Sequence, residues 1–341
     1  MPRSSDVRVE VVANREIAPA YFSMRLAVPP RLARFRPGQF LMLGWDEGCD
    51  PFLPRAMSIR RVRRFQVPSS KFRVLQPGTR NPKPGTWIAE VEILYKIYGR
   101  GTALLAAMRP GRFLRALGPL GNAFEVSRSA TGVIMVAGGI GVPPIAALAE
   151  SLAKRGTSRR TEMTVFLGGR SKADLLCAAD FRRAGAKVHM ATEDGSFGYK
   201  GLVTEAVEEF LRTSHLAPRT LTRAQQAAPL PRTPHPAPRQ GRSKQRPYLA
   251  PRTLVVAPRT SHLAPRTIMY ACGPHPMLAA LTPIAEKYDL PYQASLEANM
   301  ACGFGACVGC VVPVKGGEGH RTYRLVCKDG PVFDAHDILW A

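Results

Sequence analysis

Four cysteines near the end of the chain constrain its fold more than any other feature. Cys302, Cys307 and Cys310 form a C-x4-C-x2-C pattern, and Cys327 follows after sixteen further residues. This spacing is typical of a plant-type [2Fe-2S] cluster, in which four thiolates converge on a compact core. The intervening glycines let the backbone wrap closely around such a core and direct N–H groups at the sulfurs. The pattern therefore predicts a two-iron cluster held by these four thiolates.

A tetrahedral zinc site is the alternative for the same cysteines. Zinc sites usually show two C-x2-4-C pairs well apart, whereas here a close pair stands at one end of the pattern. Cys49 and Cys177 lie outside the pattern and are expected to be small buried hydrophobic residues. Because the seven cysteines are odd in number and no secretion signal is recognisable, we do not expect a disulfide framework.

The length and hydropathy of the chain fit a soluble protein of several domains. Its 341 residues allow two or three domains, and its 45% hydrophobic content is ordinary for globular proteins. The first residues lack the apolar core of a signal peptide, and no stretch approaches the roughly 18 apolar residues of a membrane-spanning helix. We therefore expect a cytoplasmic protein without membrane contact.

Apolar periodicity divides the chain into three predicted domains. Residues 1–125 contain short alternating runs punctuated by Pro-Gly pairs, which indicates an antiparallel β-barrel. In residues 126–290, continuous apolar strands alternate with helical stretches, which is typical of a doubly wound parallel α/β sheet. Residues 291–341 contain the cysteine cluster and too little periodic apolar sequence for a core of their own. A metal centre is expected to stabilise this small C-terminal domain.

Residues 213–267 interrupt the second predicted domain with repeats of the type SHLAPRT. They contain ten prolines, nine arginines, one lysine and no acidic residue, and so supply +10 of the formal net charge of +23. Proline blocks helix formation, and few large apolar side chains offset the entropy cost of ordering. We predict a disordered insertion. A binding arm for RNA or acidic lipids is the alternative, but with Tyr248 as the one tyrosine, tryptophan or phenylalanine of the segment we expect no nucleic-acid binding.

Glycine-rich turns mark a nucleotide site in the second predicted domain. The stretch VAGGIGVPPI places glycines between a strand and a helix, where close backbone approach and a helix N-terminus suit a pyrophosphate. The stretch CGPHPM ends another parallel strand, and ligands of doubly wound sheets bind outside the carboxyl ends of the strands. The EDGSFG turn at 193–198 is expected at the same edge. The candidate nicotinamide-binding residues are Gly138, Gly139, Gly141, Cys272, Gly273 and Pro274.

The chain resembles the ferredoxin reductase-like flavoproteins, and among them closely the electron-transfer subunits of NAD-dependent dihydroorotate dehydrogenases. Five stretches carry the resemblance, in the family's order: GPLGNAF, AGGIGVPP, YACGPHPM, EANMACGFGACVGC and VCKDGPVF. The resemblance covers nearly all of the chain except the insertion and a long basic loop at 60–87.

The resemblance implies an FAD-binding barrel, a nicotinamide domain and a C-terminal [2Fe-2S] domain. Arg55 suits the flavin diphosphate, because its guanidinium is a fixed fork of donors, and Ser58 can hydrogen-bond the flavin ring. The GRGT turn offers backbone N–H groups. Leu94 and Tyr95 have a second interpretation, in which they cover the barrel face. The implied FAD contacts are Arg55, Ala56, Met57, Ser58, Leu94, Tyr95, Lys96, Gly101 and Thr102.

Two features depart from the family pattern. Where the family has Arg-Pro-x-Ser, this chain has Arg-Ala-Met-Ser, which keeps the arginine and the serine. The insertion falls between a predicted helix and a predicted strand. Such a connection lies at the amino-terminal edge of the sheet, opposite the cofactor crevice, so we expect cofactor binding to survive it.

The function implied by the resemblance is electron transfer in the synthesis of UMP. A partner subunit with FMN oxidises dihydroorotate, and the electrons pass through the [2Fe-2S] cluster and FAD to NAD⁺; the family implies a heterotetramer of two subunits of each kind. No side-chain acid or base is expected to be catalytic. One alternative is a flavin/iron-sulfur NAD(P)H oxidoreductase subunit of a sulfide, hydrogenase or ferredoxin-NADP complex. Another is a nucleic-acid-binding protein that uses the basic insertion.

Two cationic residues bear on the preference between NAD⁺ and NADP⁺. Arg170 and Lys172 follow the second strand of the predicted sheet and could receive a 2′-phosphate. Cationic residues also occur at such positions for solubility, so NAD⁺ is expected by resemblance over NADP⁺.

Overall fold

The computed structural model describes most of the chain outside the two long basic segments. Cys49, residues 67–86 of the loop expected at 60–87 and nearly all of the 213–267 insertion lie outside the described residues, so the predictions made for them stay predictions. The ends of that expected loop are strand instead, because residues 61–66 pair with the strand that begins at Trp87. The described residues are 5–45, 53–66, 87–127, 130–154, 161–214, 267–317 and 320–340.

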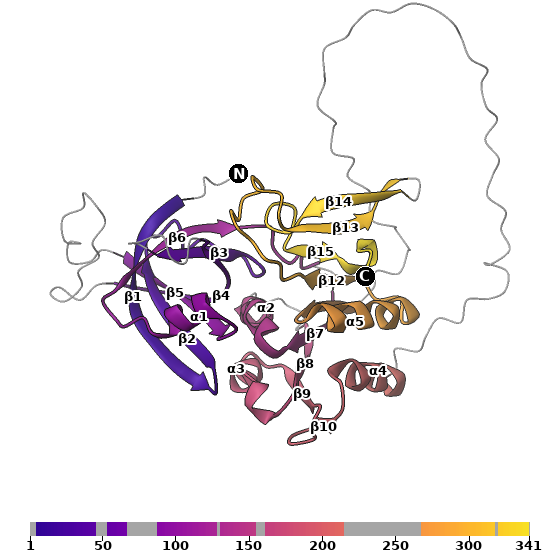
Figure 1. Cartoon of the computed structure of the whole chain (residues 1–341). Helices are drawn as coiled ribbons and strands as arrows, with labels where there is room; N and C mark the ends of the chain where they lie inside the picture. Colours follow the sequence, from indigo (N-terminus) through magenta and orange to yellow (C-terminus); the bar gives the residue numbers. More distant parts are fainter. Residues whose placement is uncertain are drawn as a thin grey trace, which may run out of the picture.

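The N-terminal part is a closed antiparallel barrel (Figure 1). Its strands alternate between buried and partly exposed residues, because successive side chains of a strand point to opposite faces. In the first strand, Val7, Val9 and Val11 point into the barrel core. The sequence prediction of a barrel is confirmed. The strands, in the order in which they pair, are β1 (Ser5–Ala18), β2 (Tyr21–Val28), β5 (Trp87–Lys96), β4 (Arg55–Gln66), β3 (Phe40–Trp45) and β6 (Phe113–Leu120), and a short helix α1 (Arg100–Ala106) follows β5.

The second part is a seven-stranded sheet whose last strand, β15, is antiparallel. In β7, Val133 to Ala137 are all buried, as expected for a strand covered by helices on both faces. The order of the parallel strands reverses between β7 and β11, which makes this pair the topological switch point. The strands, in order across the sheet, are β10 (Tyr199–Lys200), β9 (Lys187–Thr192), β8 (Glu162–Gly169), β7 (Gly132–Gly138), β11 (Thr267–Cys272), β12 (Tyr292–Ser295) and β15 (Val332–Asp334).

Helices cover both faces of this sheet. Apolar side chains of α2 (Val142–Lys154) and α3 (Ala178–Arg183) pack into one cluster with the sheet, and those of α4 (Val203–Thr213) and α5 (His275–Lys287) pack into another. Figure 1 shows α2 and α3 on the side of the barrel and α4 with α5 on the other side. The doubly wound fold predicted from the sequence is therefore present.

The C-terminal part combines the cysteine loop with a hairpin of β13 (Val311–Lys315) and β14 (Arg321–Leu325). The strands β12 and β15 lie on either side of this hairpin in sequence, yet both belong to the large sheet. Cys310, Cys327 and Val312 share one buried cluster with residues of α5 and of the sheet. The sheet thus continues across the predicted boundary at 290/291, and the cysteine loop packs on an existing core.

No helix in the described part of the chain is long and apolar enough to cross a membrane.

A candidate cofactor site where three parts of the chain meet

A cavity of about 890 Å³ lies where the barrel, the large sheet and the cysteine loop come together. The barrel contributes the stretches predicted to bind flavin, the sheet contributes the turns after β7 and β11, and the C-terminal part contributes the segment before the cysteines. The residues that line it include Phe40, Leu53–Ser58, Leu94–Lys96, Tyr98, Thr102, Ile140, Pro143, Cys272, Ser295–Ala301, Gly309 and Pro331.

Arg55, which is predicted to bind the flavin diphosphate, lies at the start of β4. Nη1 of Arg55 donates a hydrogen bond to the carbonyl oxygen of Leu53 at 2.6 Å, and the guanidinium lies 5.8 Å from the ring centre of Trp45. Its side chain passes directly over Gly101, where a Cβ atom would lie 2.3 Å from Nε of Arg55. Glycine is therefore required in the GRGT turn for the arginine to reach this position. Arg55 and Gly101, both of which are predicted to contact the flavin, therefore lie in direct contact with each other.

Two of the other predicted flavin contacts have partners within the protein. The hydroxyl of Tyr95 donates to Oδ1 of Asn14 at 2.9 Å, so its side chain is committed to the barrel. Nζ of Lys96 donates to the hydroxyl of Tyr21 at 2.9 Å and forms an ion pair with Asp174 at 3.3 Å. Asp174 lies in the 3-10 turn η2 (Lys172–Asp174), which follows β8. The Lys96 ammonium thus connects the barrel to the nicotinamide domain.

The glycines predicted to bind a dinucleotide let two turns touch by their backbones. Gly139–Gly141 form the 3-10 turn η1 between β7 and α2. A Cβ atom on Gly141 would lie 2.3 Å from the carbonyl oxygen of Cys272, and one on Gly138 would lie 2.9 Å from Cδ of Pro274. The two predicted nucleotide stretches are therefore in direct contact at the switch point of the sheet, where ligands of such sheets bind.

Cys272 closes this corner of the cavity as a neutral thiol. It is 2% exposed, and burial, reinforced by the nearby Glu297, raises its pKa well above the ordinary value for cysteine. A protonated thiol of this kind offers a small apolar surface rather than a nucleophile. Whether Cys272 lies beside a bound ring stays a prediction.

The four cysteines of the cluster motif are brought together as two interacting pairs. The thiols of Cys302 and Cys307 interact directly, and so do those of Cys310 and Cys327. The charge on Cys302 also acts on Cys327, so the two pairs are neighbours. Cys310 and Cys327 are buried, whereas Cys307 is exposed. The Cys307 thiol is therefore at the surface, and the thiols of Cys310 and Cys327 lie against the core.

Backbone N–H groups point at the sulfurs of this loop. The N–H groups of Ala306 and Cys307 donate to Sγ of Cys302 at 3.3 and 3.5 Å, and that of Cys327 donates to Sγ of Cys310 at 3.4 Å. Burial opposes a charge on Cys302, but these donors outweigh it and lower its pKa to about 6. Burial and the adjacent Cys310 raise the pKa of Cys327 to about 12.

The donor set fits a two-iron cluster. Four thiols packed this closely repel one another once ionised, and cations that bind thiolates relieve the repulsion. Two adjacent pairs match a cluster in which each iron takes two thiolates, and the N–H donors match the hydrogen bonds that tune cluster sulfurs.

Sequence reasoning missed part of the cavity wall. The segment from Ser295 to Ala301, Tyr98 and Phe40 line the cavity, yet none was singled out as a site residue. The position of SLEANMA directly between the last parallel strand and the first cluster cysteine was an available signal. Ala301 and Gly309, which line the cavity, each adjoin a cysteine of the cluster motif, so the cavity reaches the cysteine loop.

Known proteins resemble this chain in both sequence and fold. A family model for the iron-sulfur cluster binding domain of dihydroorotate dehydrogenase B matches residues 297–339, and an oxidoreductase NAD-binding domain matches residues 135–223. A "dihydroorotate dehydrogenase B (NAD(+)), electron transfer subunit" from Geobacillus thermodenitrificans is 32% identical over 97% of this chain and 98% of its own length. A protein of the same name from Shouchella clausii is 30% identical over 99% of both chains.

Solved structures share the fold at lower sequence identity. That of an NADH-dependent reduced ferredoxin-NADP oxidoreductase has a TM-score of 0.65 at 22% identity, over 100% of this chain and 92% of that one. The ferredoxin reductase of carbazole 1,9a-dioxygenase has a TM-score of 0.54 at 21% identity, over 84% and 67% of the two chains. These likenesses establish a ferredoxin reductase-like fold.

Proposed function

The chain belongs to the family of electron transfer subunits of dihydroorotate dehydrogenase B (NAD(+)), and we propose that it delivers electrons from dihydroorotate oxidation to NAD⁺ in pyrimidine biosynthesis. It is thus an oxidoreductase subunit that uses FAD, a [2Fe-2S] cluster and NAD. The observation that carries the proposal is the single cavity shared by the flavin stretches, the dinucleotide turns and the cluster loop.

The electron balance of the proposed reaction is simple. Dihydroorotate loses two electrons and two protons to become orotate in a partner subunit, and NAD⁺ gains two electrons and one proton to become NADH. When bound, the cluster and FAD supply the exchange between single-electron transfer and hydride transfer. The residues of this chain would hold those groups next to one another.

Each predicted site residue except Tyr95, whose hydroxyl is bonded to Asn14, has a proposed task in this arrangement. Arg55 and the GRGT turn at Gly101 and Thr102 would hold the flavin diphosphate, and Ser58, with Ala56, Met57 and Leu94, would face the flavin. The turns at Gly138–Gly141 and Cys272–Pro274 would receive the nicotinamide nucleotide. The thiols of Cys302, Cys307, Cys310 and Cys327 would hold the two irons. Lys96 would line the flavin site while its ammonium stays paired with Asp174.

A partner surface surrounds the exposed cluster cysteine. Phe304 and Val308 flank Cys307 in the loop, and Val311 and Tyr323 belong to the adjacent hairpin; these four apolar side chains are 48 to 58% exposed. Exposed apolar side chains gathered beside a functional group are typical of interaction sites. The partner is proposed to be the FMN-containing subunit that oxidises dihydroorotate, with two copies of each subunit in the complex.

The nucleotide is proposed to be NAD⁺ rather than NADP⁺. Lys172 points its ammonium at the ring of Phe197, 5.3 Å from the centroid, and the exposed Glu193 and Asp194 stand at the end of the neighbouring β9. Carboxylates at this edge would repel a 2′-phosphate. We expect a higher kcat/KM with NAD⁺ than with NADP⁺, and the reverse order would refute the assignment.

Co-purification and turnover test the function. The chain should be co-expressed with its candidate partner, purified anaerobically, and assayed for NADH formation from dihydroorotate and NAD⁺. We expect NADH and orotate in equal amounts, with no NADH when Cys307 is replaced by serine. Reduction of the complex by hydrogen or polysulfide, with no response to dihydroorotate, would show that the chain serves a different dehydrogenase.

A further inference from the structure

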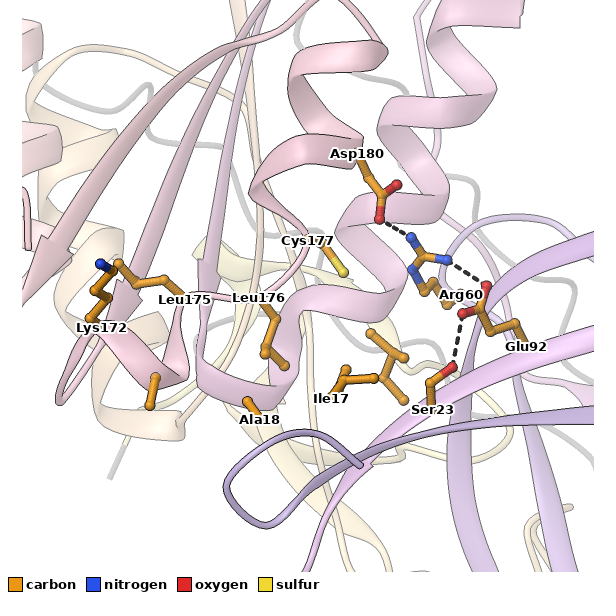
Figure 2. A pocket seen from close by; sticks show the side chains of 12 residues that line it. Ile17, Ala18, Ser23, Arg60, Glu92, Lys172, Leu175, Leu176, Cys177 and Asp180 are labelled. Carbon is orange, nitrogen blue, oxygen red and sulfur yellow. Dashed lines mark hydrogen bonds and ion pairs between the residues drawn. The ribbon is translucent and has the colours of Figure 1, made fainter. Parts of the chain in front are cut away.

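Two consecutive arginines of the flavin-binding strand β4 reach across to the nicotinamide domain. Nε of Arg61 donates to Oε2 of Glu150 in α2 at 2.7 Å, and Arg60 donates to Asp180 in α3. Arg60 also bonds Glu92 of the barrel strand β5. Figure 2 shows the guanidinium of Arg60 between Asp180 and Glu92, at the end of a cleft between the two domains.

A β-bulge allows both arginines to face the same way. Ile59 pairs with Ile93 and Arg61 pairs with the adjacent Glu92, so β4 has one extra residue, Arg60, at this point. In a regular strand, consecutive side chains point to opposite faces of the barrel, and one arginine would be lost to the interface. A bulge adds a residue and redirects side chains locally. The bulge therefore makes a double contact possible from a strand that would otherwise supply one.

The arginine contact is buried and depends on its partners. Arg60 is 5% exposed, and in the described part of the chain its Nε has no hydrogen-bond partner. Burial disfavours the charge on Arg60, but Cys177, Glu92 and Asp180 together outweigh it and raise its pKa above the ordinary value. Removing one partner of such a buried pair leaves the other charge uncompensated, which is costly. The pairs thus favour one relative orientation of the two domains.

The cleft beside the arginines shows why their contact matters for orientation. It measures about 760 Å³ and separates the end of β1 from the segment between η2 and α3, with Ile17, Ala18, Leu175 and Leu176 in its walls. The domains are bridged by polar groups at two places: by the arginine pairs at the end of this cleft, and by Lys96 and Tyr21 with Asp174. Loss of one bridge leaves the second in place, so the domains would tilt rather than separate.

The strand that carries the arginines, β4, and one of the helices they bind, α2, each adjoin a proposed cofactor site. The arginine contacts therefore link the two sites directly. The strand β4 carries Arg55 and Ser58, a few residues before the bulge. The helix α2 begins at Val142, immediately after the glycine turn that is proposed to receive the nucleotide. We infer that Arg60 and Arg61 are positioning residues, which, through Asp180 and Glu150, set the alignment of nicotinamide and flavin for hydride transfer. This inference rests on the proposed function.

The test is a double-mutant cycle on the more accessible pair. Arg61→Met, Glu150→Gln and the double variant should be prepared with FAD bound, and flavin reduction by NADH followed by anaerobic stopped-flow absorbance. We expect each single variant to lower the limiting rate about tenfold, part of the roughly 100-fold that a displacement of about 1 Å can cost. The double variant should lose no more than either single one. The apparent Kd for NADH should change less than about twofold, because the nucleotide turns themselves are intact.

Two further measurements separate positioning from general damage. Arg61→Lys should recover part of the rate, because an ammonium can still pair with Glu150. The long-wavelength absorbance that arises when nicotinamide stacks on flavin should weaken in Arg61→Met and return in Arg61→Lys. As a matched control, Lys187→Met and Glu162→Gln break an ion pair of 2.6 Å within the nicotinamide domain and should leave the rate unchanged.

The possible results distinguish this inference from the proposed function. Rates within twofold of wild type in both single variants, losses that multiply in the double variant, or an equal loss in the control pair would each overturn the positioning role. Wild-type protein that holds FAD but accepts no hydride from NADH would refute the proposed function, and the positioning role with it.

Discussion

Replacement of Gly141 by alanine tests the contact between the two nucleotide turns. The new Cβ atom would lie 2.3 Å from the carbonyl oxygen of Cys272, 2.5 Å from its carbonyl carbon and 2.6 Å from the backbone nitrogen of Gly273. Ordinary contacts between such atoms are about 3.5 Å, so the turns must separate by roughly 1 Å. Because all three neighbours are backbone atoms, no side-chain rotation can relieve the clash.

The expected cost of Gly141→Ala follows from that displacement. Overpacking of this kind destabilises proteins by about 1–3 kcal/mol, which should appear as a lower midpoint in urea unfolding. Hydride transfer from NADH should slow by up to about 100-fold, because the turns that hold the nucleotide are moved by about 1 Å. Gly317→Ala is the matched control, since a Cβ atom there meets nothing within 4 Å. Unchanged stability and an unchanged rate in Gly141→Ala would refute the close contact of the two turns.

Three further results are expected. Gly101→Ala should displace the guanidinium of Arg55 and raise the Kd for FAD about tenfold, with little change in the urea midpoint of the apoprotein. Fluorescence titration measures this Kd, and a wild-type value would contradict the role given to Gly101. Burial opposes the charge on Glu150, but Lys154 and Arg61 outweigh it and lower its pKa below the ordinary 4.5. Ionised Glu150 therefore stabilises the fold above about pH 4.5. The difference in unfolding free energy between wild type and Glu150→Gln should shrink as the pH falls below that value. A difference that grows as the pH falls below 4.5 would contradict this sign. Phe304→Ser should weaken binding of the partner subunit at least tenfold in calorimetry and leave NADH-dependent flavin reduction intact, whereas equal affinity would exclude this face from the interface.

Periodicity and spacing were sufficient to predict the architecture. Alternating runs in the first part and continuous apolar strands in the second reflect burial on one face and on two faces, and those patterns depend on neighbouring residues alone. The cysteine spacing is similarly local, because three of the four thiols lie within one loop. The contact between the β7 and β11 turns was predictable too, since carboxyl ends of parallel strands share one edge of the sheet.

Features that depend on contacts between domains could not be predicted from local pattern. Nothing in the sequence RRVRR indicates a bulge at Arg60, because the bulge appears in the pairing of β4 with β5. The ion pair of Lys96 with Asp174 joins residues 78 positions apart, so local pattern gave no sign of it; the flavin contact expected of Lys96 stays a prediction. The addition of β12 and β15 to the large sheet was hidden for the same reason: these strands are short, and their partners are distant in sequence.

Iron-edge anomalous diffraction from crystals of the anaerobically purified, FAD-loaded protein tests the central claim most directly. We predict two iron peaks among the thiols of Cys302, Cys307, Cys310 and Cys327, and flavin density in the adjoining cavity beside Ser58. A single metal peak at the zinc edge, or flavin bound away from that cavity, would contradict the account.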